Sequence, residues 1–131
     1  MTMIGNLERI RELTQKIRIK QHEYRGMLPA LAPVRLDGMP RAAGEVEAMD
    51  ALVDARTEML ERIQRMIDEL LTIECEVKPF VDALPEHLHT FAMCYYYDGH
   101  DIENVTVIMG KGKSTLYKYK DDIRKLGEKF D

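Results

Sequence analysis

A long apolar periodicity over residues 45–78 is the feature that most constrains the fold. Three sets of apolar residues, each repeating every seven positions, begin at Val46, Met49 and Leu52, and only Arg56 interrupts them. This spacing predicts one amphipathic helix from about Glu45 to Lys78, roughly 50 Å long at about 1.5 Å per residue. Three apolar positions per heptad make a stripe wider than a two-helix seam requires, so the helix needs more than one packing partner.

A second apolar stripe precedes it. Met3, Ile10, Ile17, Tyr24 and Leu31 also repeat every seven residues and predict a helix from about Ile4 to Leu28. Six basic and three acidic residues lie in that helix, whereas the 45–78 helix holds four basic and ten acidic ones. The opposite net charges of the two helices favour an antiparallel, coiled-coil-like hairpin, in which the two apolar stripes pack together as a simple core. The wide second stripe favours a homodimer or larger oligomer through these helices.

Prolines and glycines separate the blocks. The segment from Pro29 to Gly44 holds three prolines and two glycines, which break helices because proline lacks an amide donor and clashes with the preceding turn. Pro79 is expected to end the second helix, and residues 82–85 read as a short linker. The sequence therefore predicts a hairpin part at 1–80, with a breaker loop at 29–44, and a separate domain at 84–131.

The C-terminal block predicts three short helices, which makes the whole chain all-α. Pro85 opens the first helix, and Asp98-Gly99 ends it with a turn. Asp101 is a favourable N-cap for a helix over 102–109, and Gly110 suits the left-handed residue after it. The last helix begins near Lys113. The expected inward residues of the last two helices are Ile102, Val105, Ile108 and Met109, then Leu116, Tyr119, Ile123, Leu126 and Phe130.

A short helix, a glycine turn and a longer helix make the helix-turn-helix pattern. The second helix of such a pair fills the major groove of duplex DNA. Residues 111–125 hold six basic and two acidic residues in a chain of net charge −4, which is a local basic patch. Asp121 repels phosphate, although it can accept a bond from a cytosine amino group. The expected DNA contacts are Lys111, Lys113, Ser114, Thr115, Tyr117, Lys118, Asp121, Arg124 and Lys125.

The residues at 84–86, 96–105, 108–110 and 113–117 resemble region 4 of sigma factors. The chain as a whole resembles small sigma-like proteins of phages and prophages of Gram-positive bacteria, related to the ArpU and RinA type of late transcription regulators. The resemblance implies a transcription regulator that binds double-stranded DNA. It also implies RNA polymerase as a further candidate partner. Thr106, Gly112, Asp121 and Asp122 depart from the residues usual in that motif.

Two other readings fit the same pattern. In the first, the region-4-like end is a protein-interaction module that contacts RNA polymerase or another factor and binds little DNA. In the second, the chain is a DNA-packaging component such as a small terminase subunit, which also combines a helix-turn-helix with oligomerising helices. A ring of many subunits would favour the packaging role.

Other chemistry has little support in the sequence. His87 and His89 are two residues apart and point to different faces of a helix, so they do not form a metal pair. Lys111–Thr115 lacks the spacing and preceding strand of a P-loop. We expect no catalytic activity, cofactor or metal.

Cys75 and Cys94 are expected to be reduced, buried thiols. The sequence shows neither a signal-peptide core nor an apolar run long enough to span a membrane, and this favours the cytoplasm.

Overall fold

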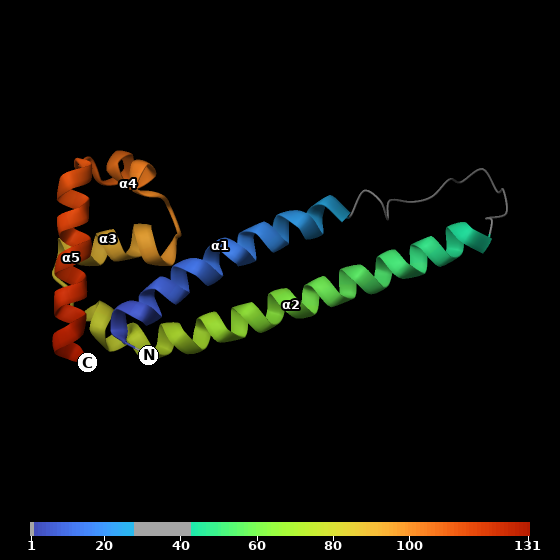
Figure 1. The fold of residues 1–131 in the computed structure, drawn as a ribbon, viewed down its shortest axis with the longest axis horizontal. Helices are drawn as coiled ribbons and strands as arrows, with labels where there is room; N and C mark the ends of the chain where they lie inside the picture. Colours follow the sequence, from blue (N-terminus) through green and yellow to red (C-terminus); the bar gives the residue numbers. More distant parts are fainter. Residues whose placement is uncertain (1, 28–42) are drawn as a thin grey trace. The chain divides into compact units, whose positions relative to one another are not determined.

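The computed structural model describes the backbone of residues 2–27 and 43–131, and the side chains of residues 2–27 and 49–131. All regular structure in these ranges is helical, which confirms the predicted all-α class. The elements in chain order are α1 (Met3–Met27), α2 (Ala43–Asp82), α3 (Glu86–Ala92), the π-helical turn η2 (Met93–Tyr97), α4 (Ile102–Met109) and α5 (Lys113–Phe130) (Figure 1). Most of the predicted breaker loop lies outside the described residues.

The chain forms two compact units. The terminal unit comprises Met1–Lys16 and Asp68–Asp131, and the middle unit comprises Ile17–Ile67. The first half of α1 and the last turns of α2 thus belong with α3, α4 and α5. The division between the units differs from the predicted boundary at residues 80–84, and the hairpin and helix-turn-helix ranges stay predictions.

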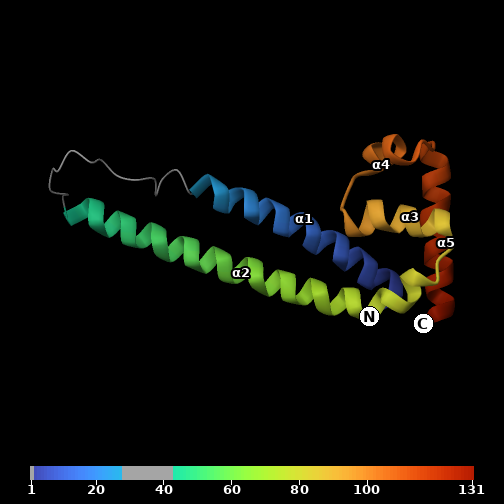
Figure 2. The same ribbon diagram turned by 180° about the vertical axis from the view of Figure 1, so that it is seen from behind.

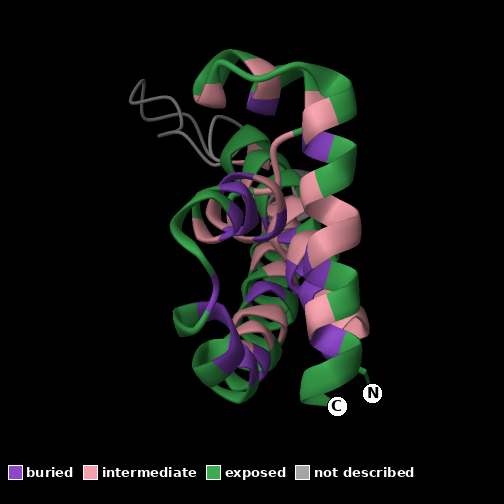
Figure 3. Ribbon diagram, turned by 90° about the vertical axis from the view of Figure 1, so that its left-hand side faces the viewer, coloured by how far each residue is buried: buried purple, intermediate pink, exposed green. Residues whose placement is uncertain are grey.

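The core of the terminal unit draws on every helix. Buried ribbon segments of neighbouring helices are turned toward one another in Figure 3. Phe91 of α3 is the centre of an aromatic cluster: its ring is 5.3 Å from that of Tyr95 and 6.3 Å from those of Tyr96 and Tyr119. The other large, fully buried side chains of this unit, besides Tyr96, are Leu7, Ile10, Leu13, Val77, Val81, Val105, Leu116 and Ile123.

Pro79 lies inside α2 and does not end it, contrary to the prediction. The helix continues to Asp82 because the next two side chains, Phe80 and Val81, are buried with 3% and 2% exposure. Proline inside a helix costs about 3 kcal/mol, whereas burial of a large apolar side chain stabilises by about 1.5–3 kcal/mol. Two such side chains offset the proline. At its other end α2 begins at Ala43, so Gly44 is helical and does not belong to the breaker segment.

A π-helical turn extends α3, which the sequence pattern did not predict. The amide of Asp98 donates to the carbonyl of Met93 at 2.9 Å, a step of five residues instead of four. Three consecutive tyrosines lie in this wider turn. Tyr96 is fully buried, and Tyr95 stacks on Phe91 with its ring at 18° to that ring. Gly99, at φ 74°, then begins the turn into α4.

The middle unit contains the second half of α1 and the first half of α2, which lie side by side in both views (Figures 1 and 2). Arg56 Nη2 donates to the hydroxyl of Tyr24 at 2.6 Å, and its guanidinium lies 5.0 Å from the centre of the Tyr24 ring. Among the described residues of this unit, only Ile17 and Ile63 are buried apolar side chains. The core of the middle unit is therefore thin.

The two cysteines differ in environment. Cys94 is buried, as predicted, whereas Cys75 is exposed because it lies on the outer side of α2; both are free thiols. Burial raises the pKa of the Cys94 thiol, and the Asp98 carboxylate raises it further. None of the helices in the described ranges has an apolar stretch of the length that a membrane span requires.

Candidate nucleic-acid interface

Helix α4 begins and ends where its sequence predicts. The Asp101 side chain accepts a hydrogen bond from the amide of Asn104 at 2.8 Å, and this caps the first turn. Gly110 follows the helix at φ 66°, in the left-handed region that glycine adopts without steric cost. Its amide donates to the carbonyl of Thr106 at 2.9 Å. These two residues fix both ends of α4 and the direction in which the chain enters the turn before α5.

We expect Asp101→Ala to lower the free energy of unfolding by about 1 kcal/mol, because the amide of Asn104 loses its side-chain acceptor. Chemical denaturation would measure the change. Asp101→Asn is the control, because asparagine caps a helix about as well as aspartate and should restore most of the loss. A loss of the same size in Asp101→Asn would show that charge, and not capping, matters at this position.

Helix α5 is anchored by buried side chains along one side. Leu116 and Ile123 are fully buried, and the helix packs on α3 and α4. The ring of Tyr119 contacts His87 of α3 edge-on, with 5.0 Å between ring centres. Gly112 precedes the helix and provides no side-chain acceptor, so only its carbonyl contributes, by accepting from Leu116 at 3.1 Å. Tyr117 and Lys118, between the two anchors, are consequently exposed.

The first half of α5 and the turn before it present the predicted contact residues to solvent. Lys111, Lys113, Ser114, Tyr117 and Lys118 are exposed, and Thr115 is half-buried. Lys113 Nζ lies 3.4 Å from a carboxylate oxygen of Glu103 on α4, an exposed pair that stabilises little. Lys111 and Lys118 form no ion pair with any described residue. This end of α5 therefore carries positive charge that is available to an anion.

The second half of α5 is different, because Arg124 and Lys125 pair with acidic side chains of the same helix. Asp121 binds Arg124 at 2.7 Å and Lys125 at 3.0 Å, and Arg124 also binds Glu128 at 2.7 Å. Hydrogen bonds from Arg124 and then Lys125 hold the pKa of the Asp121 carboxyl below its usual value. Asp121 stays ionised at neutral pH and cancels charge that the sequence pattern assigned to DNA.

The first turns of α1 also lie against this second half. A cavity of about 230 Å³ is lined by Ile4, Glu8, Tyr117, Lys120, Asp121 and Arg124. Tyr117, Asp121 and Arg124 thus border α1 and its Glu8 carboxylate. The nine predicted contact residues divide into a largely exposed group at residues 111–118 and a second group at 121–125, in which Arg124 and Lys125 pair with Asp121.

We expect Asp121→Asn to raise the affinity for duplex DNA several-fold at low salt, because it releases Arg124 and Lys125 from their common carboxylate. Fluorescence anisotropy over a salt series would show the gain shrinking as salt rises. Asp122→Asn removes the same charge from the neighbouring position, where the structure shows no ion pair with a described residue, and is the matched control. Equal gains from both substitutions would mean that only net charge matters.

Arg11 of α1 is a positioning residue that sequence reasoning missed. Its Nη1 donates to the carbonyls of Tyr95 and His100 at 2.8 and 2.7 Å, and its guanidinium lies 4.0 Å above the Tyr95 ring. One turn later, Gln15 Nε2 donates to the carbonyl of Gly99 at 3.1 Å. Together they hold the turn that leads into α4. The only signal in the sequence is that Arg11 and Gln15 share one helix face at a spacing of four.

Ile108 and Phe130 were predicted to point inward, but both are exposed. Ile108 is 52% exposed, and its neighbour Val107 is 82% exposed. Helix α4 has only two turns and contacts α5 and η2 along a narrow line, so Val105 alone is fully buried. Phe130 is 51% exposed at the end of α5, although one edge of its ring contacts Phe80 with 5.4 Å between ring centres.

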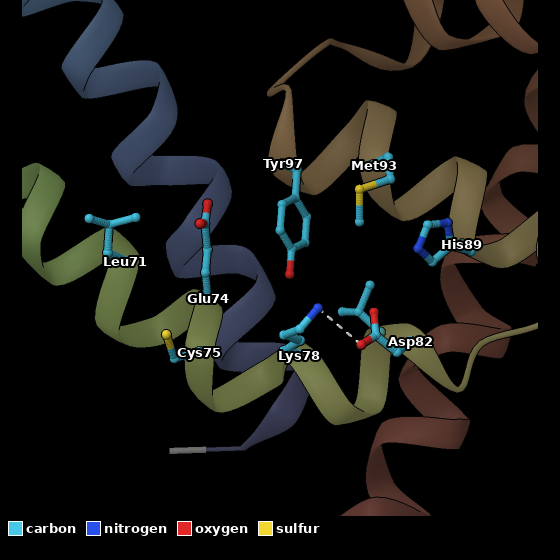
Figure 4. Close-up of a pocket in the computed structure, with 9 residues that line it drawn as sticks. Leu71, Glu74, Cys75, Lys78, Asp82, His89, Met93 and Tyr97 are labelled. Carbon is cyan, nitrogen blue, oxygen red and sulfur yellow. Dashed lines mark ion pairs between the residues drawn. The ribbon is translucent and has the colours of Figure 1, made fainter.

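A larger hollow of about 400 Å³ lies between α2 and the α3–η2 segment (Figure 4). Tyr97 projects toward α2, where Lys78 Nζ lies 3.2 Å from Asp82. Burial raises the pKa of Tyr97 to about 12 and raises the pKa of Glu74 above its usual value. No cluster of three metal-ligating side chains occurs anywhere among the described residues, this hollow included. Its lining is Leu71, Glu74, Cys75, Lys78, Val81, Asp82, His89, Met93 and Tyr97.

Comparison with protein-family models, with curated protein sequences and with solved structures finds no match to this chain.

Proposed function

We propose that the protein is a DNA-binding transcription regulator of the phage type, in which α4, the turn at 110–112 and α5 form a sigma region-4-like helix-turn-helix. In this proposal α1 and α2 form the helical hairpin that carries this domain. The observation that supports it most is the exposed, basic first half of α5. Leu116 holds this part of the helix from the inside, while Ser114 and Lys118 point away from the core.

In the proposed mode the first turns of α5 enter the major groove, and α4 lies across the phosphate backbone. Lys111 and Lys113 contact phosphates beside the groove, and Lys118 does so one turn further along α5. Ser114, Thr115 and Tyr117 reach base edges. Arg124 and Lys125 contribute less, because Asp121 binds both of them.

Electrostatics sets how such a complex responds to salt. The whole chain has a net charge of −4, so binding depends on the local lysines and not on the overall field. Three phosphate contacts release about three counterions, which predicts a slope of about −2 to −3 in log affinity against log salt. This slope is modest, and the proposed complex is of moderate affinity unless a second copy adds contacts.

Fluorescence anisotropy of a labelled random-sequence duplex, titrated with the full chain over a salt series, tests the proposal. Binding that weakens with salt at the stated slope supports it. Absence of binding at low salt, with a circular-dichroism spectrum that shows the chain folded, would refute it.

A second function is favoured by the apolar surface of α4. Val107 and Ile108 are exposed on the same short helix, and they suit a protein partner better than a phosphate backbone. In this alternative the domain contacts RNA polymerase and binds DNA weakly. Purified polymerase would then bind the full chain, Val107→Asp would remove that binding, and Lys118→Glu would leave it intact. The opposite pattern would exclude the alternative.

A further inference from the structure

Helix α2 has a second line of uncharged, mostly apolar residues in the middle unit, beside its contact with α1. Val53, Thr57, Leu60, Gln64 and Ile67 follow one another at spacings of four, three, four and three residues, and none is charged. We call these five residues the outer seam. Spacing of this kind places residues along one line of a helix, as at the contact of two coiled helices. The seam is distinct from the line that carries Ile63.

Four of the five seam residues are exposed and Ile67 is half-buried, because α1 packs elsewhere on α2. Ile63 is buried with 6% exposure, whereas Val53 and Leu60 are 47% and 45% exposed. At 100° per residue, Val53 and Leu60 point about 60–80° away from Ile63. Tyr24 of α1 is engaged with Arg56, on the same side of α2 as Ile63. The seam thus lies beside the contact with α1 and not within it.

The hydroxyl of Thr57 in the seam does not oppose burial. The hydroxyl of Thr57 donates to the carbonyl of Val53 at 3.0 Å, so a partner that covers this threonine leaves its donor satisfied. An exposed line of this length, on a unit whose described side chains include only two buried apolar residues, suits a protein contact. The remaining question is which partner covers it.

Charge indicates that the partner is another copy of this chain. Asp50, Asp54 and Glu61 are exposed next to the outer seam, and none of them forms an ion pair within the described part of the chain. On α1, Ile19 is 58% exposed and has Arg18 and Arg25 on one side of it. These two arginines likewise form no ion pair in the described ranges. The acidic edge of one copy therefore matches the basic edge of the other.

We infer that the middle units of two copies associate by a two-fold axis, with α1 of each copy lying along the outer seam of α2 of the other. A two-fold interface forms this contact twice. Ile19 of one copy packs on Val53 and Leu60 of the other, with the unpaired arginines against the unpaired carboxylates. The inference does not depend on DNA binding and goes beyond the proposed function.

Light scattering on the eluting full chain tests the inference. We expect a mass of twice the 15.2 kDa chain for the wild type. Leu60→Glu should raise the dissociation constant roughly thirtyfold or more, as expected for a residue at the centre of an interface. Ala51→Glu is the matched control: Ala51 is exposed on the same helix, about 180° from Leu60, and its substitution should leave the mass unchanged.

A charge exchange tests the arrangement of the helices. Arg18→Glu with Arg25→Glu should weaken the dimer, as should Asp54→Lys with Glu61→Lys, and the four substitutions together should restore it. Circular dichroism confirms that each variant is folded; where Leu60→Glu loses helix content, Leu60→Gln replaces it. A monomeric wild type, an unaffected Leu60 variant or a failed restoration would each overturn the inference.

Discussion

The double substitution Lys113→Glu/Lys118→Glu should lower the affinity for duplex DNA by about a hundredfold or more at low salt. Both lysines are exposed on the first half of α5, and neither touches the core. Each removed phosphate contact costs about one counterion, so the salt slope should fall by about 2. The two new carboxylates add repulsion of phosphate. Fluorescence anisotropy over a salt series measures both quantities.

A charge-matched variant separates this local effect from the change in net charge. Lys78→Glu/Lys129→Glu makes the same change at two exposed positions. Lys129 lies 16 residues after Lys113, which is about 24 Å along α5. We expect this control to bind almost as well as the wild type. Equal losses in the two variants would mean that overall charge governs binding, and the assignment of α5 as the recognition helix would be wrong.

Phe91→Ala should have the largest effect on stability, about 3–5 kcal/mol off the free energy of unfolding. The Phe91 side chain is fully buried, and its ring contacts the rings of three tyrosines from η2 and α5. Its removal leaves a cavity where α3, η2 and α5 meet. The total stability of a domain is about 5–15 kcal/mol, so the loss is a large part of it.

Chemical denaturation with circular dichroism measures this effect, because all regular structure among the described residues is helical. Val107→Ala is the control, since a side chain that is 82% exposed should change stability by less than about 0.5 kcal/mol. The two units can unfold in separate steps. The loss should then appear in the step of the terminal unit only. A loss below about 1 kcal/mol would show that the aromatic cluster repacks around the missing ring.

The local signals of the C-terminal helices were readable without any tertiary information. Asp101 and Gly110 act through their own backbone neighbours, so the cap and the left-handed residue appear where their residue types predict them. The same holds for Leu116 and Ile123, which follow a helical spacing onto one side of α5. Predictions of this kind succeed because a turn or a cap is decided within a few residues.

Pro79 shows where local rules failed. Residue type alone predicts a helix end, but the energy of burying Phe80 and Val81 against other helices exceeds the local cost. Ile108 failed in the opposite direction: its spacing predicts an inward side chain, but no neighbouring helix covers it. Burial depends on which surfaces meet, and a single helix does not contain that information.

Sequence by itself determined the all-helical class, the start of α4 and α5 and the group of lysines at 111–118. The tertiary structure decided that Arg11, 84 and 89 residues away from its two carbonyl partners, holds the turn before α4. It also placed the first turns of α1 beside Tyr117, Asp121 and Arg124, and so divided the predicted contact residues. The physical reason is range: caps, turns and periodicity act over one or two helical turns, whereas these contacts join segments that only the folded chain brings together.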